Sequence, residues 1–496
     1  MRSRFTRAFV CLCLCLGLAA CAPVERYSYE AVKQEFAAPA PSPAPAPAPP
    51  SAGQAPAPAP APAGPDWSRP LGLNQAVQVA LAHNPEQEMA LMRVRQAEAL
   101  FDQSLAAFLP MLTLYTEYTR GDAPSAYLFK IIDQRRLAPD TNFNAPGTFQ
   151  NWESGARLRW NLFRGGQDYL RRRMAAEGVA ISQLDRATVQ NTLTASVIKG
   201  YYNCLAAADM TAVAGQAVES VAAQLKQTEV RFSGGGALKS DVLSLRVRLA
   251  QAREDEVRAA NNQRLALAAL ATLLGADPDT ELRLSGQEAD EPRVPPTYAQ
   301  AVVEAMGRRP ELAKVRHQVV AARMALDAAR AEHLPRVDAQ GAVFWDDPLA
   351  QYEGERGNYS VGAALSWDAF TGFSTVHGTA KARAALREVL AADRLAGMQV
   401  QMDVKSAYLG LAEAIARLQV SRAAVEQAQE ALGLTKTQYN GGAADITRYL
   451  DAELNLNAAR ARRIAAGHDA RKARADIARA LGLFGDAAIQ EVKGHE

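Results

Sequence analysis

The chain has 496 residues, of which 48% are hydrophobic and 22% charged, and its formal net charge is +2. This length allows two or three domains, and the nearly balanced charge offers no basic face of the kind that nucleic acid requires, so we expect no nucleic-acid partner. The sequence contains no run of 18 apolar residues that would cross a membrane as a helix.

The N-terminus has the order of a bacterial export signal: three arginines, an apolar stretch over 8–18, and small residues before Cys21. The tetrapeptide Leu18-Ala19-Ala20-Cys21 resembles the lipobox of bacterial lipoproteins, in which the cysteine becomes the lipid-bearing first residue. Ala22 follows, and by analogy with known lipoproteins the absence of Asp there favours the outer membrane. We therefore predict a signal peptide over 1–20 and a covalent lipid on Cys21, with no other cofactor. An ordinary signal peptide with a chance cysteine is the alternative.

Residues 39–65 are almost entirely Pro and Ala. Such a segment cannot bury a core and favours extended polyproline II, which at ~3.1 Å per residue would reach roughly 80 Å. We interpret 21–65 as the lipid anchor and a spacer, with a proline-recognition ligand as the alternative. Once the signal is removed and Cys21 is acylated, only Cys204 remains, so we predict a buried thiol and no disulfide within the chain.

The rest of the chain repeats itself, with 66–288 as a first unit and 289–496 as a second. Five stretches return in the same order: 83–92 as 308–317, 106–115 as 331–340, 155–166 as 362–373, 231–243 as 438–450, and 269–277 as 478–486. Two copies of this length indicate one duplicated unit rather than a solenoid of short repeats. Each unit is predicted to contain two short strands followed by two very long helices.

Four segments alternate polar and apolar residues with period two: 111–119, 152–162, 336–345 and 358–368. Each has about the 9–11 residues that a tilted membrane strand needs, with one apolar and one polar face. Four tryptophans lie in or at the ends of these segments, as in interfacial belts: Trp152, Trp160, Trp345 and Trp367. A soluble sandwich with one wet face alternates in the same way, but the export signal and the long helices favour a membrane barrel.

Four strands cannot close a barrel, and open strand edges are not tolerated in lipid. The missing strands must come from other copies, so the strand count itself predicts an oligomer. Two copies would give eight strands and a barrel filled by its own side chains, whereas three would give twelve strands and room for a lumen. The charged inner faces favour three copies, and we predict a homotrimer.

No proline interrupts the helical pattern over 167–231 or over 374–439. About 65 residues at a rise of 1.5 Å make a rod on the order of 95 Å, and apolar residues recur at coiled-coil spacing. Shorter helices are predicted over 238–275 and 445–483. A soluble coiled-coil tether that conducts nothing is the alternative.

Glycines separate the two helices of each unit, at Gly234, Gly235 and Gly236 and at Gly441 and Gly442. Glycine ends helices and supplies the positive φ of a chain reversal. The first turn also suggests a phosphate-binding loop, but Leu238 stands where that motif needs glycine before Lys239, and no strand precedes it.

Residue types suited to catalysis do not cluster along the sequence. The six histidines are scattered, without an HExxH or other paired-ligand spacing, and no G-x-S-x-G elbow is present. We therefore expect a protein that is not an enzyme and has no metal site.

The whole pattern resembles the TolC-like outer membrane efflux proteins, and among them the lipidated members of efflux pumps. The resemblance covers 71–486. It rests on the duplication, on the Asn-Pro and Leu-Pro landmarks, on the strand-ending segments 160–165 and 367–372, and on the residues that follow the glycine turns. It implies a mainly α fold with membrane β structure. Three chains would form a twelve-stranded outer-membrane β-barrel that continues as a coiled-coil-like periplasmic α-helical barrel of twelve helices.

The resemblance also implies a function. Family members are passive ducts of tripartite export systems, driven by an inner-membrane transporter of the RND or ABC type through a periplasmic adaptor protein. The expected location is the outer membrane, where the chain would be lipid-anchored and barrel-inserted and would extend into the periplasm. An outer-membrane component of type I protein secretion and a non-conducting tether are the alternatives, and drugs, metals and proteins remain open as substrates.

The resemblance assigns roles to two groups of residues. Beyond the second turn, Asp451 fits an acidic position that narrows the tunnel mouth in the family, and Arg448 stands where some members carry another acid. A solvated residue or a local salt bridge with Arg448 is the alternative for Asp451. The helix-turn tips resemble the ends that meet the adaptor, at Phe232, Gly234, Gly235, Gly236, Asp241, Tyr439, Gly441 and Gly442.

Overall fold

The computed structural model describes residues 67–142, 144–286, 295–352 and 356–485, all within one compact unit, Pro65–Glu496. The predicted signal peptide, Cys21 and the Pro/Ala-rich linker lie outside the described residues. Within the described ranges, no helix is both long enough and apolar enough to cross a membrane.

The predicted strands form one antiparallel sheet in chain order, with β1 and β4 at its edges. Its strands are β1 (Met111–Gly121), β2 (Phe149–Arg164), β3 (Arg336–Asp347) and β4 (Gly357–Ser366). β2 is longer at both ends than predicted, and a bulge between Asn161 and Phe163 shifts its pairing with β3. In the described part of the chain neither edge strand has a second partner.

The two faces of the sheet differ in polarity. The register places Tyr115, Arg157 and Asp346 on one face together with other polar side chains. The opposite face carries large apolar side chains that are 64–85% exposed: Leu112, Leu114, Tyr359, Val361 and Leu365. Among the described residues no second sheet covers this apolar face, as the soluble sandwich would require. An exposed apolar face of this kind marks a surface that meets lipid or another chain.

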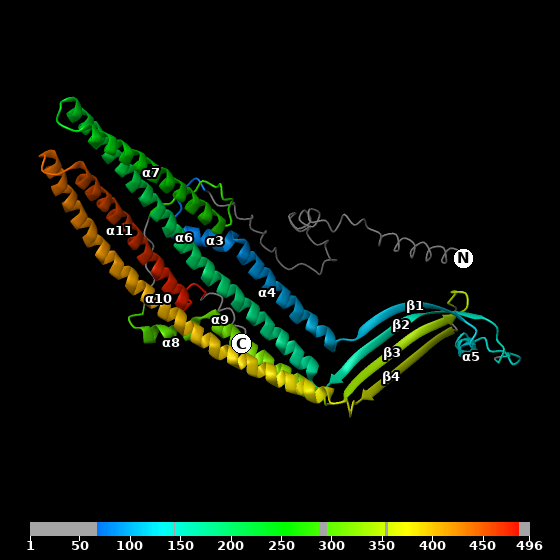
Figure 1. The fold of residues 1–496 in the computed structure, drawn as a ribbon. Coiled ribbons are helices and arrows are strands. Elements are labelled where there is room, and N and C mark those ends of the chain that lie inside the picture. The colour runs from blue at the N-terminus through cyan, green and yellow to red at the C-terminus, as the bar shows by residue number, and fades with distance from the viewer. Residues whose placement is uncertain (1–66, 143, 287–294, 353–355, 486–496) are drawn as a thin grey trace, which may run out of the picture. The chain divides into compact units, whose positions relative to one another are not determined.

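The long helices are continuous. α6 (Gln167–Ser233) and α10 (Ser374–Asn440) have 67 residues each and lead from the strands to the glycine turns (Figure 1). α7 (Lys239–Leu273) and α11 (Ile446–Leu481) return along them. α6 packs against α7 and α11, and α11 packs against α10, so the helices are ordered α7-α6-α11-α10 with α7 and α10 at the edges.

Each unit also contains a pair of helices that we did not predict. These are α3 (Leu73–His83) and α4 (Pro85–Gln103) in the first unit and α8 (Tyr298–Arg308) and α9 (Pro310–Ala331) in the second. A proline begins α4 and α9, where its missing N–H does no harm, and it ends the preceding helix. α4 packs on α6, and α9 packs on both α6 and α10. A short 3-10 turn, η2 (Ser104–Phe108), leads into β1, and α5 (Pro124–Asp133) lies between β1 and β2.

The breaks between these paired helices are tied to the ends of the returning helices. In the first unit the Asn84 side-chain Nδ2 donates a hydrogen bond to the Leu273 carbonyl oxygen at 2.9 Å. In the second unit the Arg309 Nη1 donates to the Ala480 carbonyl oxygen at 3.3 Å. We call each of these places, where the break between paired helices meets the end of a returning helix, a joint. The two repeats form the same joint, with an asparagine amide as the donor in the first and an arginine guanidinium in the second.

Gly275 and Gly482, which follow α7 and α11, correspond to each other at this joint. Both have positive φ, +76° and +78°. A Cβ on Gly275 would lie 2.3 Å from the His83 carbonyl oxygen, and one on Gly482 would lie 3.0 Å from that of Arg308. The two glycines are 207 positions apart, so the sequence match of 269–277 with 478–486 is wrong by two residues.

Each joint is packed by a buried hydrophobic cluster, and corresponding residues of the two clusters are also 207 positions apart. In the first, Leu193 and Val197 of α6 pack with Leu270 and Leu274 at the end of α7. The residues 207 positions later form the core of the second: Val400, Val404, Ile477 and Leu481. Cys204 is buried in the first cluster, which confirms the predicted buried thiol. This burial raises the pKa of the thiol to about 12.

Substituting alanine for Gly275 tests the close approach at this joint. Gly442 has the same backbone conformation, φ +77°, but nothing lies within 4 Å of its Cβ position, so Gly442→Ala measures left-handed strain alone, about 1–2 kcal/mol. Gly275→Ala adds a backbone clash, and we expect it to lower the Tm in detergent at least about twice as far. Equal shifts for the two variants would contradict the close contact.

Candidate functional site

The two glycine turns have the same geometry. At the end of α6 the Gly236 N–H donates to the Arg231 carbonyl oxygen at 2.7 Å, and at the end of α10 the Ala443 N–H donates to that of Gln438 at 2.8 Å. Bonds of this type satisfy the last carbonyl groups of a helix. Of the five predicted turn glycines only two have positive φ: Gly235 at +78° and Gly442 at +77°. These two positions require glycine for the reversal, whereas Gly236 corresponds to Ala443.

The helices that follow the turns start differently. Asp445 caps α11, because its Oδ1 accepts a hydrogen bond from the Arg448 N–H at 2.9 Å. The first turn has Leu238 at this position, and the nearest equivalent contact is the Leu238 N–H with Asp241 Oδ2 at 3.4 Å. Asp241 therefore contacts its own turn, and the second tip is the better capped of the two.

All four long helices meet in a buried cluster behind the turns, which we call the tip cluster: Val221 from α6, Leu245 from α7, Tyr439 from α10, and Ile446 and Tyr449 from α11. The Tyr439 and Tyr449 rings stack with centroids 5.7 Å apart, and the Arg231 guanidinium lies 5.5 Å from the Tyr439 ring centroid. Aromatic and cation–π contacts of this kind stabilise a packed arrangement by about 0.5–1.5 kcal/mol each. The tip cluster thus holds the two helical hairpins against each other.

The predicted tip residues divide into two groups in the structure. Phe232 is 43% exposed, and the turn glycines are exposed, so these positions are accessible. Tyr439 is 7% exposed and packs inside the tip cluster. The predicted adaptor contact through the Tyr439 side chain does not fit this burial, since stacking on Tyr449 withdraws the ring from the surface.

The two predicted aperture residues lie on the exposed side of α11. Arg448 and Asp451 are three positions apart and both exposed, while Tyr449 and Glu453 occupy the buried side. Among the described residues no ion pair joins Asp451 to Arg448, so the local salt bridge is not formed. Both charged side chains therefore remain exposed on the surface of α11.

Glu453 is a residue that the sequence analysis missed. Only 2% of its surface is exposed. Burial raises the pKa of its carboxyl group, against the opposing effects of the Ser220 hydroxyl on α6, Arg248 on α7 and Lys436 on α10. The pKa of neighbouring Tyr449 is raised by burial to about 12. Its burial could have been predicted from the spacing, because Glu453 follows Tyr449 by four residues and therefore lies on the same side of α11.

The described residues contain no group of three or more His, Cys, Asp or Glu side chains that could hold a metal ion. The geometry is instead that of two exposed helical tips closed over a buried aromatic cluster. The model of the family described as outer membrane efflux protein matches residues 76–276 and 301–483, one stretch in each repeat. The chain belongs to this family. The predicted family is thereby confirmed.

Individual proteins resemble this outer membrane efflux protein in sequence, and a solved structure resembles it in fold. The pyoverdine export outer membrane protein OpmQ of Pseudomonas aeruginosa is 25% identical over 78% of this chain and 80% of its own length. The outer membrane protein TolC of Escherichia coli is 25% identical over 77% and 76%. The solved structure of the Campylobacter jejuni CmeC outer membrane channel matches with a TM-score of 0.72 at 16% identity, covering 85% of this chain and 88% of CmeC. The predicted TolC-like fold is confirmed.

The buried carboxyl group of Glu453 predicts a pH dependence of this outer membrane efflux protein. Because its pKa in the packed tip lies above the ordinary value of 4.5, the packed state binds a proton more readily than an open state does. Stability of the packing is therefore fully present below pH 4.5 and declines as the pH rises through the raised pKa. Glu453→Gln removes this decline, so its Tm should exceed that of the wild type at pH 8 and approach it at pH 4.5.

Glu430→Gln is the matched control, since Glu430 on α10 is exposed and should leave the pH profile unchanged. Parallel Tm profiles for wild type and Glu453→Gln across this pH range would contradict the assigned role.

Proposed function

We propose that three copies of this chain close into one duct, in which the sheets form a twelve-stranded barrel and the helices a tunnel. The chain is an outer-membrane channel of the export type, since it belongs to the outer membrane efflux protein family and its relative OpmQ is named for export. The observation that carries the proposal is the sheet, whose two edge strands find no further partner within the described ranges and which has an exposed apolar face. In lipid, unpaired backbone groups cost several kcal/mol each, and only closure removes them.

The edges of the helices support the same closure. α7 and α10 lie at the two edges of the order α7-α6-α11-α10, and each carries large exposed apolar side chains. On α7 these are Leu243, Val247, Val257 and Leu265, and on α10 they are Leu395, Met398, Met402, Val420 and Leu434. If β4 of one copy pairs with β1 of the next, α10 of the first meets α7 of the second. One head-to-tail contact between copies, repeated around an axis, then covers both the strand edges of the sheet and the apolar edges of the helical layer.

The polar face of the sheet favours three copies over two. An eight-stranded barrel is filled by its own side chains, whereas Arg157 and Arg159 are long, charged and exposed on this face. Such side chains need water, and twelve strands leave room for it.

The partners follow from the family. Its members work in tripartite systems, which implies a periplasmic adaptor and an inner-membrane transporter. We infer that the exposed parts of the tips, including Phe232 and the turn glycines, meet the adaptor, and that the transporter is of the RND or ABC type. We also infer that Cys21 carries a lipid and that the Pro/Ala-rich segment links it to the barrel. OpmQ is named for pyoverdine export, and at 25% identity that substrate is not carried over to this chain.

The trimer can be broken at the helix edge. Val420 on α10 is 71% exposed, so Val420→Asp should not disturb the fold of one copy but would place a charge in the proposed contact. We expect light scattering in detergent to show a shift from three copies to one and planar-bilayer current to fall by at least about tenfold. Val303→Asp is the control, because Val303 is 76% exposed but belongs to α8 and not to α7 or α10. A wild-type monomer, or trimers that never conduct, would contradict the duct, and the latter outcome would favour the tether.

The exposed position of Asp451 predicts a cation-sensitive aperture. Three copies would bring three Asp451 carboxylates together, and like charges a few ångströms apart resist closure unless cations bind between them. Asp451→Ala should therefore alter block by divalent cations by about tenfold in the apparent binding constant. Asp445→Ala is not a suitable control because it removes a helix cap, so Asp469→Ala, further along α11, serves instead. Unaltered single-channel behaviour of Asp451→Ala would count against the aperture.

A further inference from the structure

We propose that α5 forms a second constriction of the duct, at the end of the sheet remote from the helices, and that it limits the size of solutes there. This inference rests on the proposed trimeric duct. Four observations carry it: an asymmetry of the duplication, the face of the sheet that α5 occupies, the buried contacts that hold it there, and the apolar side chains that it turns away from the sheet.

The segment that holds α5 is where the two repeats differ in length. Asn84 and Arg309, before the strands, are 225 positions apart, whereas Gly155 and Gly362, within the second strand of each unit, are 207 apart. The first unit thus has 18 more residues between its two strands than the second. All the helical matches after that point keep the spacing of 207, so this connection is the principal addition that the first repeat carries.

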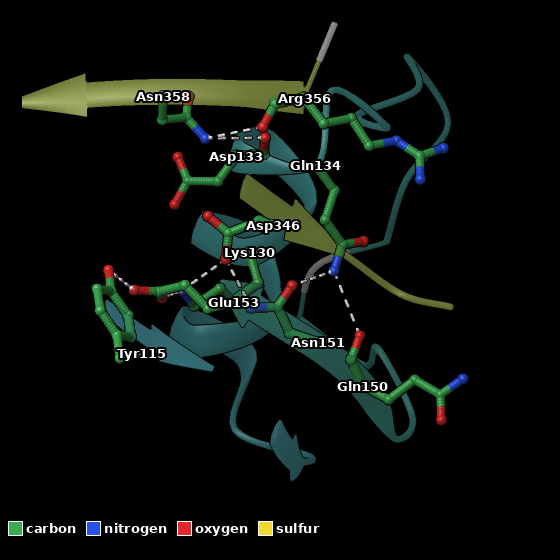
Figure 2. A network of polar contacts seen from close by, with 10 residues as sticks. All are labelled: Tyr115, Lys130, Asp133, Gln134, Gln150, Asn151, Glu153, Asp346, Arg356 and Asn358. Atoms are coloured by element: carbon green, nitrogen blue, oxygen red, sulfur yellow. Dashed lines mark hydrogen bonds and ion pairs between the residues drawn. The ribbon is translucent and has the colours of Figure 1, made fainter. Parts of the chain in front are cut away.

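The additional segment folds onto the polar face of the sheet. Lys130 of α5 reaches two carboxylates, with its Nζ 2.7 Å from Glu153 Oε2 and 2.9 Å from Asp346 Oδ1 (Figure 2). Glu153 and Asp346 are direct cross-strand partners on β2 and β3. Both lie on the same face as Tyr115, whose hydroxyl donates to Glu153 Oε1 at 2.8 Å. In a closed barrel with its apolar face toward lipid, this face lines the lumen, so α5 lies inside.

Further buried contacts fix the C-terminal end of α5 to three strands. The Gln134 Nε2 donates to Asn151 Oδ1 on β2 at 2.8 Å, and the Asn151 Nδ2 donates to Asp346 Oδ1 on β3 at 2.6 Å. On β4 the Asn358 Nδ2 donates to the Asp133 carbonyl oxygen at 3.3 Å. Gln134, Asn151 and Asp346 are each no more than 2% exposed. Figure 2 shows this network closing around the end of α5.

Lys130 is the group on which this attachment depends. Two carboxylates directly opposite each other on neighbouring strands repel. The Lys130 ammonium lies between them and is the cation that contacts both among the described residues. Removing it would leave Asp346, which has no exposed surface, beside a second negative charge. Loss of one partner from a buried charge cluster is strongly unfavourable, so without Lys130 the carboxylates must regain water and α5 must move off them.

The other side of α5 is apolar and open. Phe129 is 65% exposed and Ile132 is 38% exposed. At 100° per residue they project from the side of the helix opposite Lys130 and Gln134, and therefore toward the axis of a closed barrel. Twelve strands about 4.8 Å apart and tilted about 40° enclose a barrel roughly 24 Å across. Three helices, each roughly 10 Å in diameter, would fill most of it and meet through these side chains. Apolar rings of this kind restrict both size and water.

Thiol labelling from outside intact cells tests the constriction without depending on the helix tips. Gln340 is exposed on the polar face of β3, six residues before Asp346 and so about 20 Å along the strand toward the helices. In full-length Gln340→Cys we expect a small methanethiosulfonate to react and a 5 kDa polyethylene glycol maleimide to be excluded. Adding Phe129→Ala and Ile132→Ala, or Lys130→Met, should raise the rate with the large reagent at least about tenfold. The double alanine variant changes only exposed side chains and is not expected to impair folding.

Two controls define the outcomes. Arg135→Cys, in the exposed segment after α5, should react with both reagents, and Lys130→Arg should keep the large reagent out because it retains the charge between the carboxylates. Cys204 is buried and should stay silent. Reaction of Gln340→Cys with the large reagent in the otherwise unaltered protein would overturn the constriction and leave the duct intact. No reaction with the small reagent, when Arg135→Cys reacts, would mean that this face lines no open lumen, and the duct would fail with it.

Discussion

An unpaired strand edge in lipid leaves a row of N–H and C=O groups without partners, and this constraint shapes everything else in the chain. β1 and β4 both present such edges, on either side of an apolar face. The helices follow the strands in the same order, since α4 leads into β1, β2 into α6, α9 into β3, and β4 into α10. Any contact that pairs the strand edges therefore also brings together the apolar edges of the helical layer. The same contact between neighbouring copies therefore closes both the barrel and the tunnel.

At the helix tips, favourable aromatic and apolar packing is opposed by the burial of an ionisable group. The tip cluster stacks two tyrosines and buries apolar side chains from all four helices, but it also buries the carboxyl group of Glu453. A fully apolar cluster would be more stable. A buried ionisable group makes the packed state conditional, because the surrounding medium alters its free energy relative to an open one. Two hairpins held by a modest cluster of this kind can exchange between arrangements, which is what a duct that must open requires.

Much of the fold could be predicted from the sequence because its signals are long and periodic. The four strands and four long helices differ from the predicted ranges by only a few residues, since period-two alternation and proline-free helical stretches leave little ambiguity. The paired helices before each first strand were not predicted, although Asn84-Pro85 and Arg309-Pro310 lie in stretches that match between the two repeats. A proline at the first turn of a helix begins it as readily as it ends the one before.

The site was less accessible to prediction. The turn glycines were found, but the burial of Tyr439 depends on Tyr449, which lies on another helix and whose stacking no local pattern encodes. The α5 segment was missed for the same reason. Lys130 looks like any surface lysine until β2 and β3 bring Glu153 and Asp346 together, and these two residues are far apart in the chain. Charges that pair across long sequence separations become visible only when the register is known.

The equal lengths of α6 and α10 limit how such a protein can vary. One residue inserted into either helix would advance the rest by 1.5 Å and rotate it by 100°, which would turn every later buried side chain out of its contact. Both hairpins would have to change together, by whole turns, to stay level. A connection between strands can change in length without this cost. The 18 residues that distinguish the two halves lie in such a connection, so the first repeat carries its addition at the sheet end, where it leaves the packing of the long helices unaltered.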